Sequence, residues 1–135
     1  MVKSLWLNLP VSNIAKARQF YSEIGFSFNE QQETAESACM VVGERKTIVM
    51  LFSQQQFERF TRNKIPTSGT QVLLSVDVKS REEVDTLTLK ARAAGAKIFA
   101  EPAEAMGWMY GSGFEDLDGH RWNVLHMDLS KLPQQ

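Results

Sequence analysis

The sequence predicts an α+β fold made of two βαβββ modules whose mixed sheets curve around a cleft. The main observation is a repeat: a short apolar strand, an amphipathic helix that stops at a glycine and three β-rich runs occur in about residues 1–53 and again in about 70–129. The second observation is size. A chain of 135 residues with 43% hydrophobic side chains is long enough to fill the core of one domain.

The first module opens with the apolar run Leu5–Val11, which is typical of a buried strand. Ser12 and Asn13 can cap the helix that follows, because their side chains accept hydrogen bonds from free backbone N–H groups. Apolar residues recur at helical spacing up to Ile24, and Gly25 ends the helix. The predicted strands that follow are residues 26–29, 38–42 and 47–52.

The second module repeats this order. An apolar run over 72–76 precedes Ser80 and Glu83, which form a capping box, and the helix then runs to Gly95. The predicted strands that follow are residues 97–100, 108–115 and 121–127, with a tight turn at 116–119. Together the modules predict one domain over residues 1–129, with a helical linker at 54–69 and a C-terminal tail at 130–135.

Composition excludes several classes of function. The formal net charge is only −1, so no strong field attracts nucleic acid. The apolar runs are strand-sized, which excludes a membrane span, and no signal-peptide pattern opens the chain. We therefore expect a cytoplasmic protein. The single cysteine, Cys39, has no second thiol for a disulfide and is expected to be a buried strand residue.

Two motifs carry a resemblance to a known family. Residues 11–21, Val-Ser-Asn-Ile-Ala-Lys-Ala-Arg-Gln-Phe-Tyr, with Gly25 and Phe26 after them, resemble the first strand–helix unit of the vicinal oxygen chelate superfamily. Residues 114–124, which hold the turn Asp-Leu-Asp-Gly, resemble its last hairpin. The resemblance implies the fold shared by glyoxalases, bleomycin-resistance proteins and extradiol dioxygenases, and it covers nearly the whole chain.

Metalloenzymes of this superfamily hold a divalent ion with histidines and glutamates on the first and last strands of each module. The matching positions here are Trp6, Met50, Gln71 and Asn123, none of which is a usual ligand. Of the two histidines, His120 falls in a turn and His126 alternates to the face opposite Asn123. We therefore expect no metal and no other cofactor.

The same alternation indicates which residues would line the cleft. The predicted ligand-binding residues are Trp6, Asn8, Met50, Phe52, Gln71, Leu73, Trp108, Tyr110, Arg121 and Asn123. This lining is mostly apolar and aromatic, which suits a small organic molecule. Trp108 and Tyr110 lie between glycines and would form a mobile wall over the ligand, or else complete the sheet core or a dimer contact. No catalytic residue is identified.

Two functions remain open. The chain either binds or sequesters a small, largely apolar or aromatic molecule without metal, as bleomycin-resistance proteins do, or is a glyoxalase-, lyase- or dioxygenase-like metalloenzyme with non-standard ligands. A subunit with an empty cleft is a further possibility. The resemblance also implies a homodimer.

Overall fold

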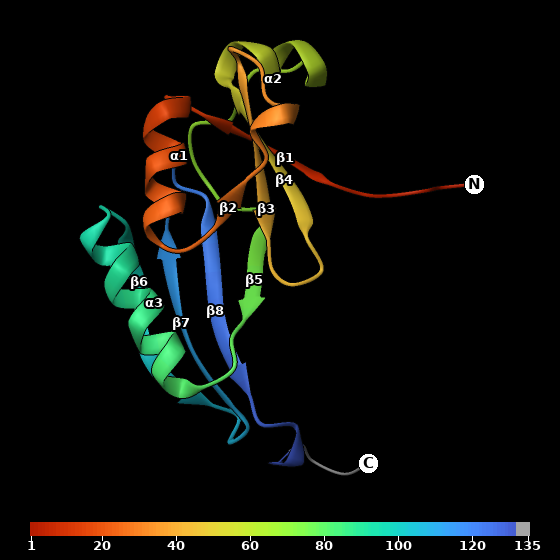
Figure 1. Ribbon diagram of the computed structural model, residues 1–135. Coiled ribbons are helices and arrows are strands. Elements are labelled where there is room, and N and C mark those ends of the chain that lie inside the picture. The colour runs from red at the N-terminus through yellow and green to blue at the C-terminus, as the bar shows by residue number, and fades with distance from the viewer. Residues whose placement is uncertain (132–135) are drawn as a thin grey trace. The chain divides into compact units, whose positions relative to one another are not determined.

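The computed structural model describes residues 1–131 and divides the chain into two compact units, Met1–Gly69 and Thr70–Gln135 (Figure 1). The unit boundary falls at the end of the predicted linker. That both units belong to one domain stays a prediction. Most of the predicted tail, residues 132–135 of 130–135, lies outside the described residues.

The first unit holds a four-stranded sheet with strand order β1-β4-β3-β2. Its elements are β1 (Leu7–Val11), α1 (Ile14–Glu23), β2 (Ser27–Phe28), a 3-10 turn (Glu30–Gln32), β3 (Ser37–Val42), β4 (Thr47–Ser53) and α2 (Gln54–Thr61). β1 runs parallel to β4, and the other neighbours are antiparallel. The first and last strands of the repeat are therefore hydrogen-bonded to each other.

The second unit has the same topology, with strand order β5-β8-β7-β6. Its elements are β5 (Leu73–Asp77), α3 (Arg81–Ala93), β6 (Lys97–Ala105), β7 (Met109–Glu115), β8 (Arg121–Met127) and a 3-10 turn (Leu129–Lys131). β5 and β8 are parallel, and the two remaining pairs are antiparallel. The predicted fold class, α+β with two mixed βαβββ sheets, is confirmed.

Local chemistry sets the helix ends. The Asn13 side chain accepts a hydrogen bond from the backbone N–H of Lys16 at 2.9 Å, and Gly25, with φ of 103°, follows the end of α1. At α3 the Ser80 hydroxyl accepts from the N–H of Glu83 at 3.1 Å, and the Glu83 carboxylate accepts from the N–H of Lys79 at 2.7 Å. The predicted caps are present in both units.

Each unit has its own core between its helix and one face of its sheet. In the first unit Phe20 and Tyr21 of α1 are fully buried together with Leu51 of β4. In the second unit Phe114 and Trp122 are stacked, with ring centroids 6.2 Å apart. One polar contact lies in this second core: the Thr88 hydroxyl donates to the carbonyl oxygen of Val84 at 2.7 Å and therefore accepts from Ser112 at 2.6 Å.

Three details differ from the sequence prediction. β1 begins at Leu7 and β5 at Leu73, so Trp6 and Gln71 precede their strands. β6 extends to Ala105, well beyond the predicted end at Ala100, although it contains Pro102. The strand tolerates this proline because β6 is an edge strand whose register shifts between Ala100 and Ala103.

Among residues 1–131, no helix has the length and apolar character needed to cross a membrane.

Candidate functional site

Each sheet has one face against its helix and a second face opposite it. In the first sheet the alternating residues Leu9, Val11, Val49 and Leu51 are buried on the α1 side. We call the opposite surface the open face of the first sheet, and it is formed by Asn8, Pro10, Ile48, Met50 and Phe52. Four of these five side chains are apolar and none carries a charge, so this face favours contact with an apolar molecule.

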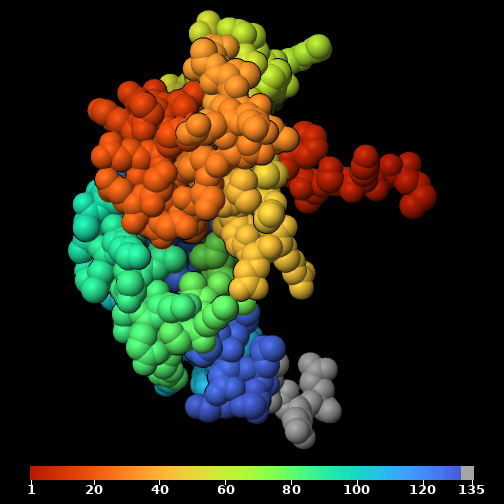
Figure 2. Space-filling view, in the orientation of Figure 1, coloured from red at the N-terminus to blue at the C-terminus, as the bar shows by residue number. Residues whose placement is uncertain are grey.

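The structure brings together three of the residues predicted for the first module. Asn8 and Met50 are direct neighbours across β1 and β4, and Phe52 lies two residues further along the same face. The Phe52 ring also contacts Phe60 of α2 edge-on, with centroids 5.2 Å apart. The first residues of the chain, red in Figure 2, project from the first unit, and Trp6, which directly precedes β1, has 53% of its surface exposed. Trp6 and Asn8 are exposed, whereas Met50 and Phe52 are half-buried.

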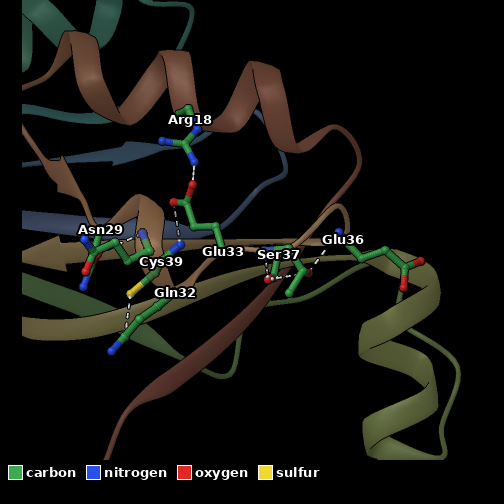
Figure 3. Close-up of polar contacts among 9 residues, drawn as sticks. Arg18, Asn29, Gln32, Glu33, Glu36, Ser37 and Cys39 are labelled. Carbon is green, nitrogen blue, oxygen red and sulfur yellow. Dashed lines mark hydrogen bonds and ion pairs between the residues drawn. The ribbon is translucent and has the colours of Figure 1, made fainter.

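Met50 has a second neighbour, Cys39 of β3, which is fully buried as predicted. Its thiol donates to the side-chain oxygen of Gln32 at 3.7 Å, and its backbone N–H donates to Glu33 at 2.9 Å (Figure 3). Glu33 is in turn ion-paired with Arg18. Burial raises the pKa of Cys39, so its thiol stays protonated and is a poor metal ligand and a poor nucleophile.

The open face of the second sheet is more polar. Its residues are Leu73, Ser75 and Asp77 of β5, Lys97 and Phe99 of β6, Glu115 of β7, and Arg121, Asn123 and Leu125 of β8. Leu73 pairs with Arg121, and Ser75 pairs with Asn123. Three predicted residues, Leu73, Arg121 and Asn123, are therefore close neighbours on one surface, whereas Gln71 lies just before the strand and is exposed.

Arg121 is held on two sides. Its Nε and Nη2 both lie 2.8 Å from Oε1 of Glu115, and its guanidinium carbon lies 4.3 Å from the centroid of the Phe99 ring. The ring has room to lie there because β7 carries Gly113 beneath it, where a Cβ would be 2.5 Å from Cε1 of Phe99. The guanidinium is thus fixed by a carboxylate at one edge and an aromatic ring on one face.

Trp108 and Tyr110 lie elsewhere. Tyr110 pairs with His126, and its side chain is on the α3 side of the sheet, opposite to Arg121 and Asn123. Its hydroxyl donates to Asp85 of α3 at 2.7 Å, and this hydrogen bond raises the pKa of Tyr110. The structure therefore separates Tyr110 from the strand β8 residues with which it was grouped in the sequence prediction.

Both aromatics line a small pocket at the start of α3, with a volume of about 240 Å³. The lining residues are Lys79, Ser80, Arg81, Glu82, Gly107, Trp108, Met109, Tyr110, His126, Asp128 and Lys131. The guanidinium of Arg81 lies 5.0 Å from the Tyr110 ring centroid and is paired with Glu104, which lowers the pKa of Glu104. Nδ1 of His126 lies 3.1 Å from the carbonyl oxygen of Val78, within hydrogen-bonding distance.

Sequence reasoning missed several members of the open face of the second sheet, among them Phe99 and Glu115. The signal that was available is the spacing of Gly111 and Gly113, two strand glycines on one face. Glycine inside a strand indicates that another side chain lies close to the backbone. Here Leu125 lies over Gly111 and Phe99 over Gly113.

The side chains at the superfamily's ligand positions do not fit a transition-metal ion. Trp6 offers no lone pair, Met50 offers a soft thioether, and Gln71 and Asn123 offer neutral amide oxygens. Nor do the side chains of residues 1–131 form any group of three histidine, cysteine, aspartate or glutamate residues able to hold a metal.

Comparison with known proteins places the fold. A family described as bleomycin resistance protein-like N-terminal matches residues 3–43. A hypothetical protein from S. aureus is 34% identical, with a TM-score of 0.86, and the match covers 93% of this chain and 95% of that one. No curated protein matches the chain.

Two more distant solved structures share the fold. A glyoxalase/bleomycin resistance protein/dioxygenase family enzyme from Burkholderia phytofirmans PsJN is 23% identical, with a TM-score of 0.81 over 90% of this chain and 96% of that one. The fosfomycin resistance protein FosX from Listeria monocytogenes, complexed with Mn(II), is 16% identical, with a TM-score of 0.71 over 96% of both chains. The repeated βαβββ topology and these similarities show that the chain has the fold of the glyoxalase/bleomycin resistance protein/dioxygenase structures, and its residues 3–43 match the bleomycin resistance protein-like family.

Proposed function

We propose that this protein binds a small, largely apolar or aromatic organic molecule without the help of a metal ion. The observation that carries the proposal is the chemistry of the four ligand positions, where Trp6, Met50, Gln71 and Asn123 replace the histidines and carboxylates a divalent ion requires. A binding role of the bleomycin-resistance type needs no such ligands. The alternative is a metalloenzyme with non-standard ligands.

The open face of the first sheet supports this proposal. Ile48, Met50 and Phe52 are all partly exposed, and Asn8 between them offers one amide for orientation. Burial of an aromatic ring removes about 150 Å² from water, which at roughly 25 cal/mol per Å² contributes about 4 kcal/mol before the entropic cost of binding. Because that cost is itself about 4 kcal/mol or more, ring burial has to be combined with further contacts, such as hydrogen bonds to Asn8, for binding to be measurable.

We also propose that the protein acts as a homodimer in the cytoplasm. The support is the superfamily resemblance for the dimer and the composition for the compartment. Sedimentation equilibrium tests the dimer directly, since a mass near 15.3 kDa would show a monomer.

The first test separates the two functions. The protein, purified without an affinity tag, is incubated with nickel, zinc, iron, manganese or cobalt, and its metal content is measured beside a thermal-shift titration. We expect substoichiometric metal and an unchanged Tm. Stoichiometric metal with a raised Tm would overturn the metal-free proposal, since binding to the folded state stabilises it.

The second test addresses ligand binding itself. A panel of small aromatic and aliphatic compounds is screened by thermal shift in the presence of a chelator. Met50→Ser, on the open face of the first sheet, is expected to reduce the shift given by any compound that binds there. Leu89→Ser is the matched control, because Leu89 is 62% exposed on α3. If a compound gave the same thermal shift with Met50→Ser and with Leu89→Ser, binding on the open face of the first sheet would be contradicted.

A further inference from the structure

The arrangement around Arg121 points to a narrower class of ligand. We propose that the bound molecule carries a carboxylate and that Arg121 receives it, with the apolar or aromatic body of the molecule lying against the neighbouring leucines. This inference rests on the proposed function and adds the chemical group by which the ligand is recognised.

Arg121 presents an edge of N–H donors to a ligand. Nε and one N–H of Nη2 are engaged by Glu115, and the Phe99 ring supports one face of the guanidinium. A guanidinium has five N–H donors. The two hydrogens of Nη1 and the second hydrogen of Nη2 therefore form a donor edge that points away from Glu115. A planar carboxylate fits such an edge through two parallel hydrogen bonds.

Arg121 is preorganised for binding. An arginine side chain loses rotamer entropy when it is fixed. Here the folded protein has already fixed it, through Glu115 on β7 and through Phe99, which lies over Gly113. The side chain nevertheless remains 35% exposed. Arg121 is thus rigid and accessible, which is the combination that a recognition group needs.

The charged side chains of this face are two cations and two anions. Lys97 pairs with Glu115 across β6 and β7, and Asp77 pairs with Leu125 across β5 and β8, so all of them share the face of Arg121. Because the face as a whole is close to neutral, the planar donor edge of Arg121, and not a general positive field, favours a carboxylate.

Both apolar and polar side chains surround this donor edge. Leu73, the direct neighbour of Arg121 on β5, is 51% exposed, and Leu125 lies over Gly111 on the same face. Asn123 and Ser75 are paired between them. A molecule with its carboxylate on Arg121 therefore meets apolar surface and two further polar groups within one or two strand residues.

The test compares 2-naphthoate with 2-naphthamide, which has the same ring system and no charge. Binding of each is followed by NMR titration of the full-length protein, with the Arg121 Nε–H signal as the direct reporter. We expect naphthoate to bind more tightly and to shift that signal. Arg121→Gln should weaken naphthoate binding about tenfold to a hundredfold, the scale of a charge-assisted hydrogen bond, and leave naphthamide binding unchanged.

Three further variants keep the test decisive. Arg121→Lys retains the charge and the stem but lacks the planar donor edge, so it should also weaken naphthoate binding. Glu115→Gln removes a negative charge beside Arg121 but keeps a side-chain oxygen that can accept from its N–H groups, so it should strengthen naphthoate binding. Arg81→Gln is the matched control, because Arg81 also pairs with a glutamate and lies over an aromatic ring, but on the opposite side of the sheet.

The outcomes distinguish the two proposals. Equal binding of both compounds, or equal loss in the Arg81 and Arg121 variants, would overturn the carboxylate inference and leave the proposed function standing. Absence of any shift on either open face at millimolar concentrations of both compounds would overturn the proposed function as well.

Discussion

A single added methyl group on β7 tests the packing that fixes Arg121. In Gly113→Ala the new Cβ would lie 2.5 Å from Cε1 of Phe99. Non-bonded carbons rest at about 3.5–4.0 Å, so the ring has to move by about 1 Å or more. Because Arg121 lies over this ring, its guanidinium has to move too.

Two effects of opposite sign set the magnitude. Overpacking costs typically about 1–3 kcal/mol, and replacing glycine by alanine lowers the entropy of the unfolded chain, which stabilises by about 0.4–1 kcal/mol. The backbone at Gly113 is not in the left-handed region, so no conformational strain is added. We expect a net loss in the free energy of unfolding of about 1 kcal/mol.

The assay is a double-mutant cycle measured by urea unfolding, with Gly113→Ala, Phe99→Ala and the double variant. Once Phe99 is truncated, Gly113→Ala should stabilise the protein by a few tenths of a kcal/mol or more. The coupling energy between the two positions should then be about 1.5 kcal/mol or more. If Gly113→Ala had the same effect in both backgrounds, the reasoning that Phe99 lies on this glycine would be refuted.

Three other predictions concern the second unit. Thr88→Val should lower the free energy of unfolding by about 1–3 kcal/mol, because it leaves the buried Ser112 hydroxyl without its acceptor. The double variant Thr88→Val/Ser112→Ala should lose less than the sum of the losses in the two single variants. Strict additivity of the two losses in urea unfolding would contradict this. The raised pKa of Tyr110 implies stability that is present below the pKa of the unfolded chain, near 10, and lost as pH rises through the higher folded value. Tyr110→Phe should remove that part of the stability loss at alkaline pH. If the variant and the unmodified protein lost stability identically as pH rises, the link to Asp85 would be disproved. Asp116→Ala removes the acceptor of two backbone N–H groups in the β7–β8 turn and should cost about 1–3 kcal/mol in the same urea assay; an unchanged midpoint would show that the turn does not need it.

The order of elements could be predicted from the sequence because periodicity and end signals agreed. The strand predicted over 121–127 is β8, and the predicted capping residues Asn13 and Ser80 both accept the expected hydrogen bonds. These are local properties, which a helix period or a hydroxyl at the right position determines without knowledge of the rest of the chain.

The candidate site was harder to predict because it depends on which face each side chain occupies. Alternation assigned Asn8, Met50, Leu73 and Arg121 to the cleft-facing sides of their strands, and the structure adds that Asn8 pairs with Met50 and Leu73 with Arg121. It did not indicate that Trp108 and Tyr110 belong with α3, since they were grouped by their glycine-rich surroundings and not by register. Phe99 was missed because the register shifts in β6 cannot be counted from the sequence.

The parallel pairing of β1 with β4 has a consequence for synthesis on the ribosome. Leu7 finds its partner Val49 only after about 40 further residues have emerged, and at about 5–20 residues per second that takes several seconds. Until then β1 has no strand to pair with, although β2 and β3 are already available to each other. The sheet of the first unit is therefore completed only when β4, its last strand, has emerged. In the second unit β5 likewise waits for β8 before it can pair.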